Sequence, residues 1–337
     1  MPGQAMTNKV VRVIERSDGI PGPEIFSIED AAVPQCPADG CLIEVIYTTV
    51  DPAMRGWLSS EKNYLTVATG EIMRALGVGR VLESNVADYA AGEMVYGWLG
   101  WCQVAAVPAQ AIYWKLDLDA APAEYWLSAL GLNGLTAWVG LKHLGGVKKG
   151  DTVLVSTCAG GVGSIAGQLA AIAGARPVGL TGGDEKVALS TAMFGYDEAL
   201  NYRAPGDLAA RIASACPDGI DLFFDNTAGA IADAAFPSLN IGARVVQCGT
   251  AAVASWDPVP TGPRKERDLL TKRLTWRGFI VFDHRDVFDQ AFTEMKGLIA
   301  DGRLTAQHEV IEGLDEAPGA IRYLYEGRNS GRLIVKP

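Results

Sequence analysis

A glycine-rich stretch in the middle of the chain has the residue types and spacing best suited to specific chemistry. Residues 153–168 read VLVSTCAGGVGSIAGQ, an apolar run followed by Gly160, Gly161 and Gly163 and then by small residues. A strand that turns through glycines into a helix lets the backbone approach a pyrophosphate, and the helix directs its free N–H groups and positive dipole end at it. Cys158 replaces the first glycine of the full Gly-x-Gly-x-x-Gly pattern. The strand–turn–helix order still predicts a dinucleotide site, the alternative being a helix that only packs tightly on its strand.

The end of the next apolar run indicates which dinucleotide is bound. An Asp or Glu there would bind the ribose 2′-hydroxyl of NAD. This chain has Thr181 and Gly182 instead, which leave room for a 2′-phosphate. Lys186 follows one helical turn later, and Tyr202 and Arg203 end the following segment. The pattern favours NADPH, although Lys186 could also be an ordinary solvated helix lysine.

The elements that must position these residues alternate between strand and helix from about residue 129. Short apolar strands followed by helices of about ten residues are typical of parallel β-α-β units, and therefore of a doubly wound sheet. The expected strands and helices are Thr152–Thr157, Val162–Ala173, Pro177–Thr181, Glu185–Phe194, Asp207–Ala215, Asp221–Asp225, Ile231–Leu239 and Arg244–Gly249.

The segments on either side of this region have other patterns. Before residue 129, short β-runs broken by Gly, Pro and Asp predict an irregular β-domain, with a helical or mobile segment at Ser59–Met73 beside a cleft. After it, we expect a strand at Thr275–Phe282 and helices at Arg285–Ala300 and Asp315–Tyr325. A last strand is expected at Arg332–Val335. Two domains, 1–128 and 129–309, also agree with the length of 337 residues.

Composition excludes several classes of function. A formal net charge of -10 argues against nucleic acid as a partner, since phosphate binding needs a basic face. No apolar run approaches the roughly 20 residues of a membrane-spanning helix, and Met1–Arg16 lacks a signal-peptide pattern. We therefore expect a cytoplasmic protein without membrane partners. The 6 cysteines have no Cys-x-x-Cys spacing, so free thiols are expected.

Taken together, these motifs resemble the medium-chain dehydrogenase/reductases, and within them the zinc-independent branch that contains prostaglandin, plant double-bond and bacterial curcumin reductases. The similarity extends over almost the whole chain. Its markers are residues 50–55, 131–137, 160–168, 183–186, 225–229, 278–281 and 327–331.

The resemblance implies an α/β fold, a Rossmann doubly wound parallel sheet plus an irregular GroES-like β-domain to which residues 310–337 return. It implies that Gly160, Gly161, Val162 and Gly163 lie along the pyrophosphate, with Lys186 and Tyr202 at the 2′-phosphate. It also implies that Asn226 approaches the centre of the cofactor and that Asn329 reaches back to it. The remaining positions that it places at the cofactor are Thr181, Gly182, Cys248, Gly249, Phe279 and Val281.

No catalytic metal is expected. Zinc alcohol dehydrogenases of the same superfamily need a Cys/His/acid set. Their Gly-His-Glu is replaced here by residues 75–79, ALGVG, and His143, His284 and His308 stand apart without ligand spacing. Two departures from the branch concern the substrate pocket: residues 254–256 read ASW where Ser-Tyr-Asn is frequent, and Phe282 stands where some members have Tyr.

The expected reaction is hydride delivery from NADPH to the β-carbon of an α,β-unsaturated aldehyde or ketone, with a hydrogen-bond donor at the developing enolate oxygen. Tyr64, in the variable cleft segment, is the first candidate donor, and Tyr47 is the second. The ribose hydroxyl of the cofactor or water could replace both. Alternatives are a quinone reductase and a non-catalytic NADPH-binding protein. As in many relatives, we expect a homodimer, joined through the strand near Gly278–Phe282.

Overall fold

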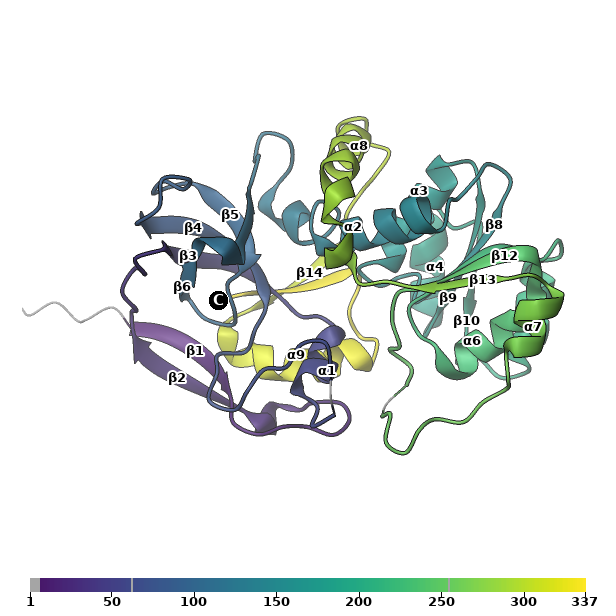
Figure 1. Ribbon diagram of the computed structural model, residues 1–337, viewed down its shortest axis with the longest axis horizontal. Helices are drawn as coiled ribbons and strands as arrows, with labels where there is room; N and C mark the ends of the chain where they lie inside the picture. Colours follow the sequence, from purple (N-terminus) through teal and green to yellow (C-terminus); the bar gives the residue numbers. More distant parts are fainter. Residues whose placement is uncertain (1–6, 62, 254) are drawn as a thin grey trace, which may run out of the picture. The chain divides into compact units, whose positions relative to one another are not determined.

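The computed structural model describes residues 7–61, 63–253 and 255–337, which form two compact units (Figure 1). The first unit runs to Leu127 and includes His308–Asn329 and Leu333–Pro337. The second unit comprises Ser128–Gln307 and Ser330–Arg332. These bounds differ from the expected ones at three places: Ser128 and Ser330–Arg332 belong to the second unit, and residues 308–309 belong to the first.

The first unit is built on a seven-stranded sheet with the order β14-β15-β3-β4-β5-β7, and β6 pairs with β3. The pairs from β15 to β7 run antiparallel, as does the separate pair β1-β2. The strands are β1 (Thr7–Val13), β2 (Phe26–Ala32), β3 (Gly40–Thr49), β4 (Leu76–Ser84), β5 (Met94–Trp98), β6 (Val104–Pro108), β7 (Ile112–Lys115), β14 (His308–Glu312) and β15 (Arg332–Lys336). The irregular β-domain expected from the sequence is confirmed.

Two helices share the core of this unit although they lie at opposite ends of the chain. Helix α1 (Ala53–Leu58) buries Met54, Trp57 and Leu58, and α9 (Ala317–Tyr325) buries Ala320 and Ile321 in the same cluster. This shared apolar core explains why the C-terminal segment folds with the N-terminal one.

The second unit is a six-stranded parallel sheet with the order β10-β9-β8-β11-β12-β13. Its strands are β8 (Thr152–Ser156), β9 (Arg176–Thr181), β10 (Glu198–Asn201), β11 (Ile220–Asp225), β12 (Leu239–Gln247) and β13 (Thr275–Gly278). Its helices are α2 (Leu132–Trp138), α3 (Gly163–Ile172), α4 (Asp184–Met193), α5 (Leu208–Ala215), α6 (Gly229–Ala235), α7 (Glu266–Thr271) and α8 (Phe288–Ala300). The predicted Rossmann sheet is thus confirmed.

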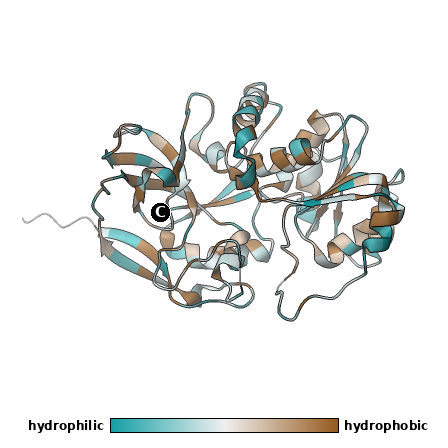
Figure 2. Cartoon of the chain, viewed as in Figure 1, coloured by the Kyte–Doolittle hydropathy of each residue, from teal (hydrophilic) through white to brown (hydrophobic). Residues whose placement is uncertain are grey.

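The two central strands of this sheet have apolar middles, Val153–Val155 in β8 and Leu222–Phe224 in β11, and hydrophobic colour recurs along the sheet in Figure 2. All five residues of β8 are buried, as are most of β11. Continuous apolar runs are typical of parallel strands, because helices cover both faces of the sheet. The strand order reverses between β8 and β11, and a ligand of such a sheet binds outside the carboxyl ends of the strands at this switch point.

Two segments differ from the expected elements. Ser59–Met73, expected to be helical or mobile, forms no helix in its described residues. The predicted strand Thr275–Phe282 stops at Gly278, because its neighbour β12 ends at Gln247, which pairs with Gly278. Beyond that pair the segment has no partner strand, and residues 281–287 form a 3₁₀ turn. Phe279 therefore lies in the connection after the sheet, and Val281 begins the 3₁₀ turn.

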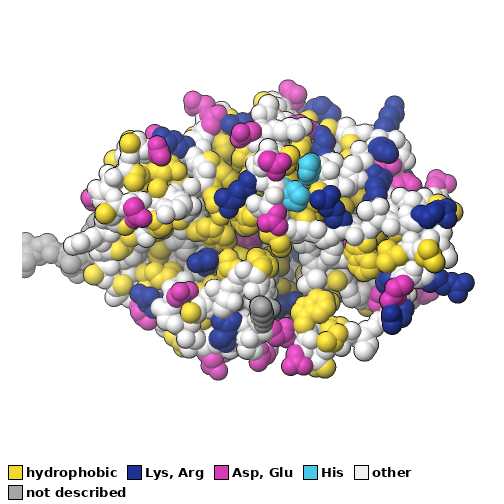
Figure 3. Space-filling view, viewed as in Figure 1, with side chains coloured by type: hydrophobic (Ala, Val, Ile, Leu, Met, Phe, Trp, Pro, Cys, Tyr) yellow, Lys and Arg dark blue, Asp and Glu magenta, His cyan; other side chains and the backbone are white. Residues whose placement is uncertain are grey.

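No helix in the described part of the chain is long and apolar enough to cross a membrane. All six cysteines are free thiols. On the face drawn in Figure 3, acidic and basic side chains are interspersed.

Candidate functional site

The glycine turn lies between β8 and α3, at the switch point of the parallel sheet. A Cβ atom on Gly163 would lie 2.2 Å from the Thr157 carbonyl oxygen, and one on Gly161 would lie 2.3 Å from Asn133 Nδ2. Close approach of backbone atoms therefore requires glycine at position 163, whereas at position 161 the end of the Asn133 side chain would have to move. No side chain caps the first turn of α3, which begins at Gly163. An uncapped helix start behind a glycine-rich turn fits a pyrophosphate.

Strained backbone marks the same edge of the sheet. Thr157, directly after β8, has φ 54°, and Ala228, in the turn after β11, has φ 56°. Such positive φ values cost non-glycine residues on the order of 1–3 kcal/mol and persist where the surroundings impose them. Both residues lie at the carboxyl ends of the two strands that flank the switch point.

A second group of residues gathers where β9 and β10 end. Tyr202 N–H donates to the Thr181 carbonyl oxygen at 2.9 Å. A Cβ on Gly182 would lie 2.8 Å from Tyr202 Oη and 3.2 Å from Arg203 Nε. Lys186 is half-buried in the first turn of α4. The structure thus brings Thr181, Gly182 and Tyr202 together and adds the guanidinium of Arg203.

The third group lies at the ends of β11 and β12. Asn226 Nδ2 donates to the Ser156 carbonyl oxygen at 2.7 Å. Cys248 and Gly249 donate their backbone N–H groups to the Asp225 carbonyl oxygen at 2.7 and 3.2 Å. Burial, together with the negative charge of Asp225, raises the pKa of Cys248 to about 12, so this sulfur remains a thiol. The group can orient a ligand but contains no activated nucleophile.

The remaining positions expected at the cofactor lie in loops. Val281 is buried and Phe279 is half-buried. A Cβ on Gly140 would lie 3.1 Å from the Phe279 ring. Asn329, which is 3% exposed, belongs to the first unit. Gly331, which belongs to the second unit, pairs with Gly160 of the glycine turn as an isolated parallel bridge.

The two candidate tyrosines differ in the state of their hydroxyl groups. Tyr64 is 62% exposed, and its oxygen accepts a hydrogen bond from Trp57 Nε1 at 3.2 Å. Tyr47 donates its proton to Glu124 Oε1 at 2.8 Å. Burial and the Glu124 carboxylate raise the pKa of Tyr47 to about 12. Tyr47 is therefore a weaker acid than an ordinary tyrosine, and its proton is already donated to Glu124.

The positions that depart from the branch pattern are both accessible. Trp256 is exposed, and Phe282 is half-buried with the Arg285 guanidinium 5.5 Å from its ring centre. Ala254, the first residue of that departure, lies outside the described residues.

The histidines were expected to stand apart, but two of them meet. The rings of His143 and His284 lie 5.4 Å apart in an edge-to-face arrangement, because a helix and a loop distant in sequence pack together. Within the described residues, no group of three or more His, Cys, Asp or Glu side chains could hold a metal ion.

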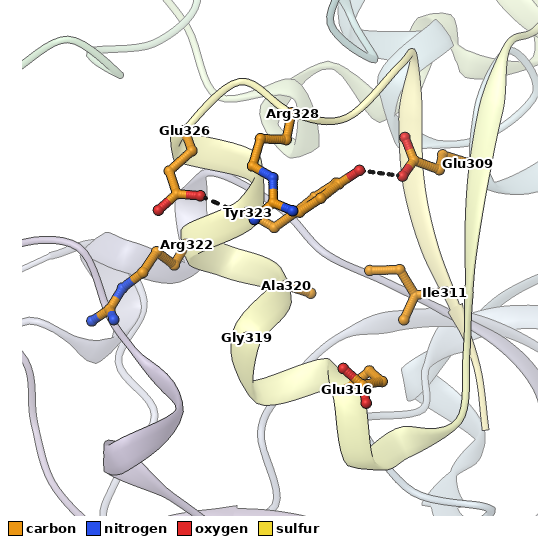
Figure 4. A pocket seen from close by; sticks show the side chains of 9 residues that line it. All are labelled: Glu309, Ile311, Glu316, Gly319, Ala320, Arg322, Tyr323, Glu326 and Arg328. Carbon is orange, nitrogen blue, oxygen red and sulfur yellow. Dashed lines mark hydrogen bonds and ion pairs between the residues drawn. The ribbon is translucent and has the colours of Figure 1, made fainter.

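A surface pocket of about 450 Å³ lies in the first unit between β14 and α9 (Figure 4). Tyr323 donates to Glu309 at 2.6 Å, and Arg328 lies over the Tyr323 ring at 4.5 Å. Arg328 and Arg322 form ion pairs with Glu326 and Glu24. Both arginines of the pocket are already paired with carboxylates, and we assign no ligand to it.

Asp225, the last residue of β11, was not among the site residues expected from the sequence. Its carboxylate is fully buried and accepts hydrogen bonds from residues of three neighbouring strands and turns. An acidic residue directly after the apolar run Leu222–Phe224 of a buried strand was the available signal.

Comparisons with known proteins agree with this geometry. Residues 9–114 match a family model described as the N-terminal domain of oxidoreductase, and residues 161–297 match one described as zinc-binding dehydrogenase. The chain is 33% identical to the NADPH-dependent curcumin reductase of Escherichia coli, over 100% of this chain and 99% of that protein. It is 32% identical to the 2-alkenal reductase (NADP(+)-dependent) of Nicotiana tabacum, over 98% of both chains. The crystal structure of CurA from Vibrio vulnificus in complex with NADPH superposes with a TM-score of 0.88 at 32% identity, over 97% of this chain and 98% of that one.

Proposed function

Because the chain belongs to the medium-chain dehydrogenase/reductase family, in its zinc-independent branch, we propose that it reduces the carbon–carbon double bond of α,β-unsaturated aldehydes or ketones with NADPH. The observation that carries this proposal is the glycine turn at the switch point, joined by a group at the end of β9 that has Lys186, Tyr202 and Arg203 but no carboxylate at the ribose position. The alkenal substrate class is supported by the name of the Nicotiana relative.

When bound, NADPH supplies the hydride for the electron-poor β-carbon of the substrate. The residues of the chain bind and orient the reactants. The backbone of Gly160–Gly163 and the uncapped start of α3 hold the pyrophosphate. Lys186, with Tyr202 and Arg203, binds the 2′-phosphate through charge-assisted hydrogen bonds, which are the stronger kind.

Tyr64 is the proposed donor to the carbonyl oxygen, on which negative charge develops during the reaction. Its oxygen already accepts from the Trp57 indole, which orients the phenol. The exposure of the side chain leaves it accessible to a substrate.

We expect Tyr64→Phe to lose roughly 5- to 50-fold in turnover, because a ribose hydroxyl or water can substitute for one lost donor. NADPH affinity should be nearly unchanged. The measurement is single-turnover NADPH oxidation with a good enone, and Tyr89→Phe, which removes a phenol oxygen from the β4–β5 loop, is the control. A rate within twofold of wild type would make Tyr64 a packing residue, and a complete loss would make it the proton source itself.

The proposal is tested by NADPH consumption against 2-nonenal, a chalcone, a quinone and a saturated aldehyde, with product mass and position of reduction recorded. The expected result is oxidation of NADPH with the enal and the chalcone, whose products gain two hydrogens across the double bond. Turnover with the quinone alone would favour a quinone reductase. NADPH binding without turnover of any compound would favour a non-catalytic binding protein.

We also propose that two copies of the chain associate through β13. This strand ends the parallel sheet, and all four of its residues are exposed. Trp276 is 43% exposed on it. An unpaired edge strand of this kind is a template for pairing with another chain. Light scattering at micromolar concentration should give the mass of a dimer, and a monomer would contradict the proposal.

A further inference from the structure

Asp225 is a buried carboxylate whose hydrogen bonds come from three different parts of the second unit. It ends β11 and is 0% exposed. Its Oδ1 accepts from Ser156 Oγ (3.0 Å), Thr227 N (2.8 Å), Thr227 Oγ1 (2.9 Å) and Ala228 N (3.0 Å), and its Oδ2 accepts from Gln247 Nε2 (2.9 Å) and Ala228 N (3.1 Å). A buried charge is tolerated only when it is paired or hydrogen-bonded in this way.

The donors belong to the segments that carry the candidate cofactor residues. Ser156 ends β8 immediately before the glycine turn. Gln247 ends β12 immediately before Cys248 and Gly249, and its amide also donates to the Gly249 carbonyl oxygen at 2.6 Å. The carboxylate therefore links the loops that follow β8, β11 and β12, all at the carboxyl edge of the sheet where ligands of this fold bind.

The turn after β11 has a strained backbone, which the hydrogen bonds to Asp225 can hold in place. Ala228 has φ 56° and ψ -159°, a backbone conformation that is essentially restricted to glycine. Both oxygens of Asp225 accept from the Ala228 N–H group. The carboxylate thus holds a strained turn in place, and with it the neighbouring Asn226, whose backbone N–H donates to Ser156 Oγ at 2.8 Å.

We propose that Asp225 is the positioning residue of the cofactor site: its carboxylate holds the loops after β8, β11 and β12 in the one arrangement that binds NADPH. Asp225 acts through these loops, without touching the substrate. The assignment rests on the proposed function only in taking NADPH as the ligand.

A purely structural role is the competing explanation, and the same strand provides a matched control. Asp221, four residues earlier on β11, accepts from Thr152 N on β8 at 2.9 Å and from Asn240 Nδ2 on β12 at 2.9 Å. It therefore links the same three strands near their other ends, away from the carboxyl edge. Asp221→Asn therefore shows how the loss of a carboxylate between strands changes stability when the carboxyl edge of the sheet is left unchanged.

The experiment compares wild type, Asp225→Asn and Asp221→Asn by NADPH titration, followed by fluorescence or calorimetry, and by thermal unfolding without NADPH. Asparagine presents an N–H donor where Asp225 has an acceptor, so one of its donors loses its partner and the turn shifts. We expect the Kd for NADPH to rise about tenfold or more in Asp225→Asn, because an unsatisfied buried donor destabilises the arrangement of the loops. Asp221→Asn should lower the unfolding temperature yet keep the Kd within twofold.

A further variant separates positioning from general damage. Ala228→Gly in the Asp225→Asn background should recover part of the NADPH affinity, because glycine adopts the turn without being held there. If Asp225→Asn does not fold, Ser156→Ala and Gln247→Ala each remove one donor to the carboxylate and should still weaken NADPH binding.

If Asp225→Asn binds NADPH as tightly as wild type does, the positioning role of Asp225 is overturned and the proposed function stands. The same holds if both donor variants bind NADPH as tightly as wild type. An equal loss of affinity in Asp221→Asn would also overturn this role. Failure of the wild-type protein to bind NADPH would overturn the proposed function and this role with it.

Discussion

Gly163→Ala is expected to weaken NADPH binding by about a hundredfold or more, which corresponds to about 2.7 kcal/mol. The added Cβ would lie 2.2 Å from the Thr157 carbonyl oxygen and 2.8 Å from Cys158 Cα. Both are backbone atoms of the glycine turn, so no side-chain rotation can relieve the contact. The turn must move away from α3, and the N–H groups at the start of that helix would no longer point at the pyrophosphate. Overpacking of this kind should also lower the free energy of unfolding by about 1–3 kcal/mol.

The control for this variant is Gly297→Ala in α8, where an added Cβ meets no atom within 4 Å. It should leave NADPH affinity unchanged and raise stability by roughly 0.5–1 kcal/mol, because alanine is favoured over glycine inside a helix. NADPH titration and thermal unfolding of both variants provide the measurement. A Kd for Gly163→Ala within threefold of wild type would show that the turn does not carry the pyrophosphate.

Lys186→Ala is expected to raise the KM for NADPH tenfold or more while leaving the KM for NADH unchanged. A lost charge-assisted contact with a phosphate costs about 1.5–3 kcal/mol. NADH lacks the 2′-phosphate, so its binding does not include this contact. The wild-type preference for NADPH should also weaken as salt is added, because Lys186 is only half-buried.

Steady-state kinetics with both cofactors, over a range of salt concentrations, provide the measurement. Lys148→Ala serves as the control because Lys148 is an exposed lysine of the same unit. Equal use of NADPH and NADH by the wild-type protein would overturn the assignment. An equal loss with both cofactors would mean that Lys186 supports the fold of α4 and does not recognise the phosphate.

The glycine turn and its flanking elements could be predicted because their signals are local. The strand and helix expected at Thr152–Thr157 and Val162–Ala173 correspond to β8 and α3, since periodicity and turn residues act over a few neighbouring positions. By contrast, β10 is short, and its partner β9 makes it a strand through the pairing of Glu198–Asn201 with Val178–Thr181. The end of β13 was misjudged for the same reason, because the extent of β12 sets it.

The candidate site likewise has features that the sequence predicted and features that only the folded chain reveals. The absence of an acid at Thr181–Gly183 was visible in the sequence, whereas the approach of Arg203 to Gly182 depends on how β10 lies beside β9. Nothing in the sequence indicated that Tyr47 would give its proton to Glu124, which is 77 residues away in the chain.

By itself, the sequence determined the class of the fold, the strand–turn–helix at Gly160–Gly163 and the lack of an acid at the ribose position, because each depends on residue types within a short window. Only the tertiary structure decided that Gly331 would pair with Gly160, that His143 and His284 would meet, and that Asp225 would join three loops. These contacts join segments that are distant in the chain. Their formation depends on strand order, register and packing, which a single sequence does not display.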